Sequence, residues 1–82
     1  MRLQLTSKAQ KELDKLDDKT ALRISHRIYQ LENNPFGPNS QKLGGGKGYR
    51  VRIGDYRVVY TVNKTAKELT IVRIRHRREV YR

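Results

Sequence analysis

The sequence predicts an α+β domain in which two helices cover one face of an antiparallel sheet. Apolar residues recur at helical spacing in the first 34 residues. In the second half, apolar and polar residues alternate in runs that turn residues separate, which is typical of antiparallel strands. A chain of 82 residues with an apolar fraction of 35% supports one modest core, so the helices and the sheet must share it. We therefore expect a single domain that spans residues 1–82.

The N-terminal segment predicts a short strand and a first helix. The run RLQL at residues 2–5 alternates polar and apolar side chains, as a strand does. Thr6 or Ser7 can then cap a helix, because either hydroxyl can accept a hydrogen bond from a free amide of the first turn. The apolar stripe of this helix is Ala9, Leu13 and Leu16. Its polar residues are expected to face water: Lys8, Lys11, Glu12, Asp14 and Lys15.

A second helix is predicted from about residue 18. Asp17 and Asp18 place negative charge at its N-terminus, where the helix dipole favours it. Pro35 ends the segment, because proline disfavours helical geometry in the residue before it. The two helices form a hairpin with one apolar side, which a sheet or a partner must cover. The apolar residues of the second helix recur through about Leu31: Ala21, Ile24, Ile28 and Leu31.

The remaining chain predicts a sheet of three to four antiparallel strands, at residues 41–43, 49–53, 56–62 and 68–75. In the last strand Leu69 and Ile71 share a parity with Arg73 and Arg75, which predicts burial on both faces at its start and an opening into a basic face at its end. The glycine run at residues 44–46 lacks the spacing of a phosphate-binding loop and opens no helix. It therefore favours a flexible hairpin turn over a phosphate cradle.

Basic charge is concentrated in the second half of the chain. The formal net charge is +11, and residues 49–82 carry ten Lys/Arg, eight of them Arg, against three Asp/Glu. Arg50 and Arg52 share the face of their strand opposite the apolar residues, and Arg57 joins them if the apolar faces of the two strands coincide. Clustered like charges destabilise one another, so we expect this face to meet a polyanion. Nucleic acid is the favoured partner, and a solvated basic surface is the alternative.

Other parts of the composition exclude several classes of function. The chain has no cysteine, which excludes disulfides and cysteine-ligated zinc. It has no apolar run of signal-peptide or membrane-spanning length, so we expect a soluble, cytoplasmic protein with no membrane partner. Paired carboxylates and a metal-ligand cluster are missing, so we expect no metal and no cofactor. Residues expected to be structural, or without a role, are Asp55 in a turn, His26 on the second helix, and core tyrosines 29, 49, 56 and 60.

The runs YRVRIGDYRVVY at residues 49–60 and RIRHRREVYR at residues 73–82 resemble the RelE/ParE superfamily of toxins from toxin–antitoxin modules, and in particular its RelE-like branch. The resemblance covers nearly the whole chain, and length and element order agree with it. It implies a ribosome-dependent endoribonuclease that cuts mRNA in the decoding site and so inhibits translation. It also implies three partners, namely a cognate RelB-like antitoxin, the ribosomal A site with its rRNA, and mRNA.

The resemblance also assigns site residues by position. Six residues match the catalytic constellation: Arg50, Arg52, Arg57, His76, Arg77 and Tyr81. Four further basic residues are expected to bind RNA: Lys47, Arg73, Arg75 and Arg78. Some relatives have lysines on the first central strand, where this chain has arginines.

The implied reaction is cleavage without a metal, in which the ribose 2′-OH attacks the phosphate and leaves a 2′,3′-cyclic phosphate and a 5′-OH. The arginines would bind the scissile phosphate and stabilise the charge of the transition state. An arginine stays protonated at pH 7, so proton transfer is left to Tyr81, to His76 or to groups of the ribosome. The alternatives are that Tyr81 packs on the sheet edge and that His76 has no part in the reaction.

Two other functions compete with this interpretation. The first is inhibition of DNA gyrase by a ParE-type toxin of the same fold. The second is a non-catalytic RNA-binding module, in which arginines hold phosphates by charge alone. The terminal HRREVY and the arginine cluster favour the ribonuclease, because the gyrase branch does not depend on them.

Overall fold

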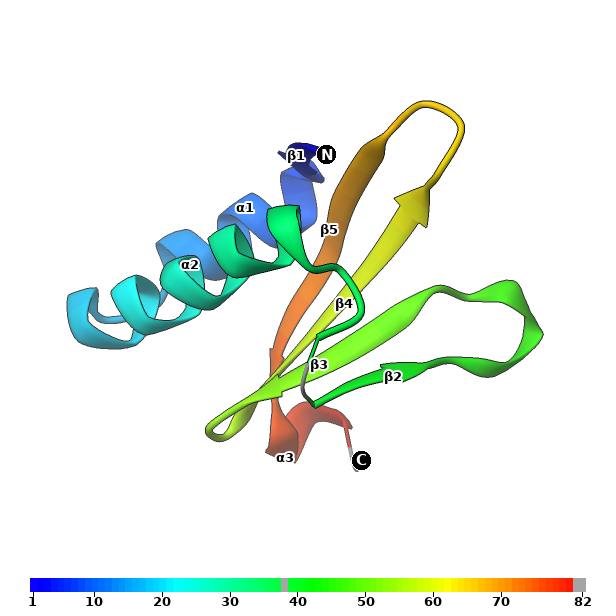
Figure 1. Ribbon diagram of the computed structural model, residues 1–82. Helices are drawn as coiled ribbons and strands as arrows, with labels where there is room; N and C mark the ends of the chain where they lie inside the picture. Colours follow the sequence, from blue (N-terminus) through cyan, green and yellow to red (C-terminus); the bar gives the residue numbers. More distant parts are fainter. Residues whose placement is uncertain (38, 81–82) are drawn as a thin grey trace.

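A computed structural model describes residues 1–37 and 39–80, and in it two helices lie against one face of a five-stranded sheet (Figure 1). The strand order is β1-β5-β4-β3-β2, in which β1 is parallel to β5 and all other neighbours are antiparallel. Within the described residues, no helix has the length and hydropathy to cross a membrane. The elements are β1 (Arg2–Leu5), α1 (Ser7–Asp14), α2 (Asp18–Asn33), β2 (Ser40–Lys42), the short 3₁₀ turn η1 (Gly44–Gly46), β3 (Tyr49–Ile53), β4 (Tyr56–Asn63), β5 (Glu68–His76) and α3 (Arg77–Val80).

The predicted α+β class is confirmed, with both helices on one face of the sheet. The prediction of three to four antiparallel strands was wrong, because β1 joins the same sheet as a parallel neighbour of β5 and brings the number of strands to five. Parallel neighbours need a long connection. Here the connection contains both helices and the strands β2, β3 and β4, so no local sequence signal predicts that β1 pairs with β5.

Polar side chains start both helices. The Thr6 hydroxyl accepts a hydrogen bond from Ala9 N at 3.1 Å and donates one to Val72 O at 3.0 Å, so this residue caps α1 and ties it to β5. Asp17 Oδ2 accepts a hydrogen bond from Thr20 N at 3.2 Å and caps α2. Hydrogen bonding to Thr20 also lowers the pKa of the Asp17 carboxyl. The cap predicted from Thr6 or Ser7 is confirmed at Thr6, and the acidic pair lies at the N-terminus of α2 as predicted.

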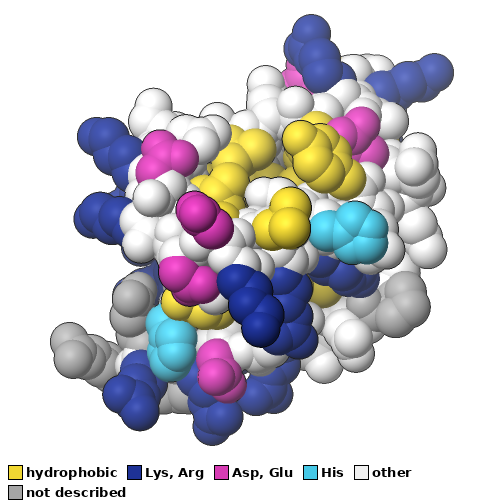
Figure 2. All heavy atoms as spheres, turned by 90° about the vertical axis from the view of Figure 1, so that its left-hand side faces the viewer, with side chains coloured by type: hydrophobic (Ala, Val, Ile, Leu, Met, Phe, Trp, Pro, Cys, Tyr) yellow, Lys and Arg dark blue, Asp and Glu magenta, His cyan; other side chains and the backbone are white. Residues whose placement is uncertain are grey.

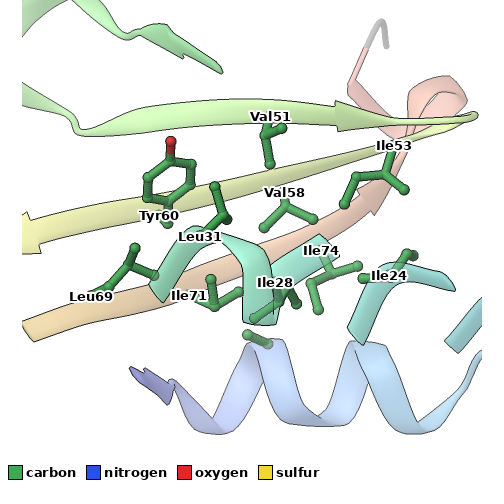
Figure 3. Packing of buried hydrophobic residues seen from close by; sticks show 11 residues of the cluster. Ile24, Ile28, Leu31, Val51, Ile53, Val58, Tyr60, Leu69, Ile71 and Ile74 are labelled. Atoms are coloured by element: carbon green, nitrogen blue, oxygen red, sulfur yellow. The ribbon is translucent and has the colours of Figure 1, made fainter. Parts of the chain in front are cut away.

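The core lies between the helices and three neighbouring strands, β3, β4 and β5 (Figure 3). The apolar stripe predicted on α2 is confirmed, with Ile24, Ile28 and Leu31 buried. Each such side chain stabilises the fold by roughly 1.5–3 kcal/mol relative to an exposed one. The buried residues are Ala9, Ile24, Ile28, Leu31, Val51, Ile53, Val58, Tyr60, Leu69, Ile71 and Ile74.

The tyrosines differ in burial. Tyr60 is fully buried, and Tyr49 and Tyr56 pack against the core. Tyr29 is 63% exposed, so its predicted place in the core was wrong. It follows the buried Ile28 by about 100° of helix rotation and therefore points away from the sheet.

A β-bulge decides which way the last strand faces. Val59 pairs with Arg73, but Tyr60 pairs with Ile71, which leaves Val72 as an extra residue in β5. The bulge reverses the parity of the strand, so that Leu69, Ile71 and Ile74 are all buried on one face. The prediction that this strand is buried on both faces at its start was therefore wrong. The mixed alternation of apolar and polar residues in this segment therefore reflects a strand with a bulge.

The glycine run forms the β2–β3 turn, as predicted. Leu43 N donates to Gly48 O at 2.8 Å and closes the turn. Gly48 has a φ of +100°, and a Cβ at this position would lie 2.5 Å from Tyr60 O. Only glycine permits this approach to β4.

An ion pair links α1 to β5 beyond the end of β1. Arg73 Nη2 donates to Glu12 Oε2 at 3.0 Å, and Ile74 N donates to Glu12 Oε1 at 2.9 Å. Partial burial by itself would raise the pKa of the Glu12 carboxyl. The hydrogen bonds from Arg73 and Ile74, together with the charges of Arg73 and Arg75, outweigh burial and lower it below 4.5. The prediction that Glu12 faces water was wrong, since its side chain is only 18% exposed.

We expect Glu12→Gln to lower the free energy of unfolding by about 1–3 kcal/mol at pH 7, because it removes the anion between Arg73 and Ile74 N. Because the pKa of Glu12 is lowered in the folded state, the ionised carboxylate stabilises the fold at pH values above the ordinary pKa of 4.5. That contribution is lost as the pH falls through the folded-state pKa. The difference between parent and variant should therefore shrink below about pH 4.5 in denaturant titrations.

Asp14→Asn is the matched control, because Asp14 is an exposed acid of the same helix. Its Oδ1 accepts a hydrogen bond from the Gln10 side chain at 2.9 Å. An equal loss in both variants would contradict a specific role for Glu12.

Candidate nucleic-acid interface

Three arginines stand side by side on the face of the sheet opposite the core. Arg52 on β3 is the cross-strand partner of Arg57 on β4, and Arg57 is the partner of Arg75 on β5. We call these three residues the arginine row. Side chains at directly opposed positions have Cβ atoms about 4.5–5.5 Å apart, so three guanidinium stems start within a small area. The sequence predicted Arg52 and Arg57 on one face and the end of the last strand opening into the same basic face. Arg75 confirms this opening, and the bulge in β5 gives the strand end its orientation.

A polar hollow of about 280 Å³ lies beside the row. Its lining residues are Asn39, Gln41, Arg50, Arg52 and Arg57. Gln41 on β2 orients Arg50, whose Nε lies 3.1 Å and whose Nη2 lies 2.5 Å from Gln41 Oε1. An amide oxygen fixes the guanidinium without neutralising its charge. Sequence reasoning missed Asn39 and Gln41, and only the β2–β3 pairing brings Gln41 to this place.

A second hollow, of about 510 Å³, lies at the end of the sheet and is lined by Asp55, His76, Arg77 and Arg78. Arg77 N donates to Asp55 O at 2.7 Å, which joins the start of α3 to the β3–β4 turn. The His76 ring packs edge-on against Tyr56, with ring centroids 5.1 Å apart. Because Tyr56 packs against the core, His76 lies on the helix side of the sheet. The predicted catalytic residues are thus divided between the two faces.

The imidazole of His76 has a structural partner. Its Nδ1 accepts a hydrogen bond from Arg78 N at 3.2 Å, which is the contact that an N-cap residue makes with the second residue of a helix. When His76 is neutral, its proton is therefore on Nε2. His76 therefore positions the start of α3.

The remaining predicted residues lie in three different places. The Arg73 side chain is 28% exposed and forms an ion pair with Glu12, so it takes part in the contact between α1 and β5. Lys47 lies in the β2–β3 turn, at the end of β3 away from Arg52. Asp55 occupies the β3–β4 turn, as predicted. Tyr81 lies outside the described residues. No group of three or more metal-ligating side chains comes together in residues 1–37 and 39–80.

The comparison with known proteins identifies the family. A family model described as the ParE toxin of the type II toxin–antitoxin system parDE matches residues 3–81. The chain belongs to this toxin family. The predicted RelE/ParE membership is confirmed, and the protein is the toxin component of a type II toxin–antitoxin system. No curated protein matches the sequence at a significant level.

Solved structures of toxin–antitoxin proteins have the same fold as this ParE-family chain. The archaeal RelE–RelB complex from Pyrococcus horikoshii OT3 is 31% identical over 93% of each chain, with a TM-score of 0.80. The RelBE2 complex from Mycobacterium tuberculosis is 20% identical over 92% of this chain and 95% of the other, with a TM-score of 0.82. The chromosomal ParDE system from P. aeruginosa is 19% identical over 93% of this chain and 95% of the other, with a TM-score of 0.77.

Substitution of His76 separates a capping role from a chemical one. We expect His76→Ala to speed amide hydrogen exchange in α3, because the Arg78 amide loses its acceptor. His76→Asn should keep exchange near the parent rate, since an Asn oxygen is a good cap. A toxin that stays active as His76→Asn would show that the imidazole is not the general acid or base. Equally fast exchange in both variants would contradict the cap.

Proposed function

We propose that this toxin is a ribosome-dependent mRNA endoribonuclease of the RelE type. The observation that carries the proposal is the arginine row beside the hollow that Arg50 lines. Guanidinium groups held in place by strands bind phosphate oxygens and stabilise the charge that develops during phosphoryl transfer. The 31% identity to the archaeal RelE–RelB structure supports the same assignment.

In the proposed reaction, the 2′ oxygen of the ribose forms a bond to phosphorus and the bond from phosphorus to the 5′ oxygen breaks. The products are a 2′,3′-cyclic phosphate and a 5′-OH. One proton leaves the 2′-OH and one is delivered to the departing 5′ oxygen. Arg50, Arg52 and Arg57 hold the scissile phosphate, and Arg77 contributes positive charge from the start of α3.

The proton route gives a physical reason for dependence on the ribosome. The residues described in the arginine row and its hollow are arginines and amides, and neither type exchanges a proton near pH 7. His76 points to the other face of the sheet. Proton transfer is therefore assigned to Tyr81, or to groups that the ribosome supplies.

The proposed inhibitor is a RelB-like antitoxin. The similar structure from P. horikoshii is a RelE–RelB complex. A chain with a net charge of +11 favours an acidic partner. An acidic, amphipathic segment that covers the arginine row would keep RNA away from it.

Inhibition of DNA gyrase is the second candidate function. The observation that favours it is the family match, because the matching model describes the ParE toxin of parDE. A supercoiling assay with purified gyrase, run beside the cleavage assay, separates the two. Inhibited supercoiling together with intact mRNA would select the gyrase function.

The cleavage assay maps mRNA ends by primer extension after incubation of the toxin with translating ribosomes. We expect codon-phased cuts with the parent. Arg57→Ala should slow cleavage by about a hundredfold or more, because one preorganised cationic donor is lost from the row. Arg57 lies on the face of the sheet opposite the core, so we expect thermal unfolding to change little.

Lys64→Ala is the charge-matched control, because Lys64 is exposed and follows β4 at the end away from the β3–β4 turn. It should cut mRNA at the parent rate. Cleavage by Arg57→Ala as fast as by Lys64→Ala would refute the assignment of the row.

A further inference from the structure

One more arginine lies against the end of the sheet. The Arg23 guanidinium, from α2, lies over Gly54 in the β3–β4 turn. A Cβ on Gly54 would be 3.1 Å from Arg23 Nη1 and 3.4 Å from its Cζ. Gly54 also has a φ of +58°, which favours glycine. Because Gly54 has no side chain, the turn leaves room for the Arg23 guanidinium to approach.

Arg23 adds to a group of cations that come from separate elements. Arg77 and Arg78, from α3, line the hollow at the same turn together with His76 and one acid, Asp55. We call these five residues the turn-end surface. Figure 2 shows Lys and Arg side chains gathered at this lower end of the molecule, beside a histidine and acidic side chains. Three arginines against one carboxylate give the surface a net positive charge.

The turn-end surface lies at the end of the sheet toward which the arginine row leads, but His76 and Arg23 lie on the helix side and the row lies on the opposite face. Along the paired strands, the row is followed by the residues Ile53, Tyr56 and His76, and then by the turn. Two residue steps along a strand cover about 7 Å. A polyanion that crosses the row toward the turn would therefore have to pass round the β3–β4 turn, from the open face of the sheet to its helix side, to reach Arg23.

We propose that Arg23 is a further RNA-contacting residue and that the turn-end surface binds a backbone phosphate of the RNA strand beyond the arginine row. The inference rests on the RNA-directed function proposed above and extends its contact surface. RNA is favoured over an acidic protein segment because the proposed function already places an RNA phosphate chain on the row, and the same chain would reach the turn-end surface by passing round the β3–β4 turn. Arginine suits this contact, since its planar fork binds two phosphate oxygens at once.

The test measures binding of a short fluorescein-labelled single-stranded RNA by anisotropy, with the full chain and no ribosome. Arg23→Ala should weaken the affinity by roughly three- to tenfold at low salt and reduce the slope of log affinity against log salt by about one. Arg23→Lys should keep the slope, because it retains the charge. Lys64→Ala removes a charge at the opposite end of β4 and should leave the slope at the parent value.

The outcomes distinguish this inference from the proposed function. An unchanged salt slope in Arg23→Ala, beside a reduced slope in Arg57→Ala, would overturn the role of Arg23 and leave the arginine row intact. A reduced slope in both variants without codon-phased cleavage would support the surface and refute the ribonuclease. If Arg23→Ala weakens binding of polyglutamate and leaves RNA binding unchanged, the surface takes an acidic protein and the inference fails.

Discussion

The register of β3, β4 and β5 against the helices is the constraint on which the rest of the structure depends. One face of these strands buries Val51, Val58 and Ile74 under α2, and the alternate residues then face outward. A slip by one residue would exchange the two sets and bury an arginine such as Arg57 in the core, which is far more costly than the loss of any apolar contact. The hydrophobic core therefore fixes the position of the cations.

Core packing also offsets the mutual repulsion of the arginine row. Opposed like charges on neighbouring strands destabilise a sheet, and the apolar face of the same strands supplies the opposing free energy. Two carboxylates are used elsewhere: Glu12 binds Arg73 at the α1 side, and Glu68 pairs with Arg2 on β1. These acidic side chains thus stabilise the periphery of the sheet.

The arginines of the row and His76 lie on opposite faces of the sheet. The row and Arg50 occupy one face, whereas His76 packs with Tyr56 on the other and positions α3. In the proposed reaction, the toxin would bind the phosphate with one face of the sheet and would depend on other groups for proton transfer. Such a division agrees with the ribosome dependence that we propose.

The sequence by itself determined the class of the fold, the stripe of α2 and the common face of Arg52 and Arg57, because these depend on periodicities of 3.6 and 2 that short segments carry. It also carried the toxin-family resemblance that the comparisons confirmed. Only the tertiary structure decided that β1 lies beside β5 and that Arg23 reaches the β3–β4 turn. Each of these joins segments far apart in the chain, and local patterns hold no information about which distant neighbour completes a sheet or a surface.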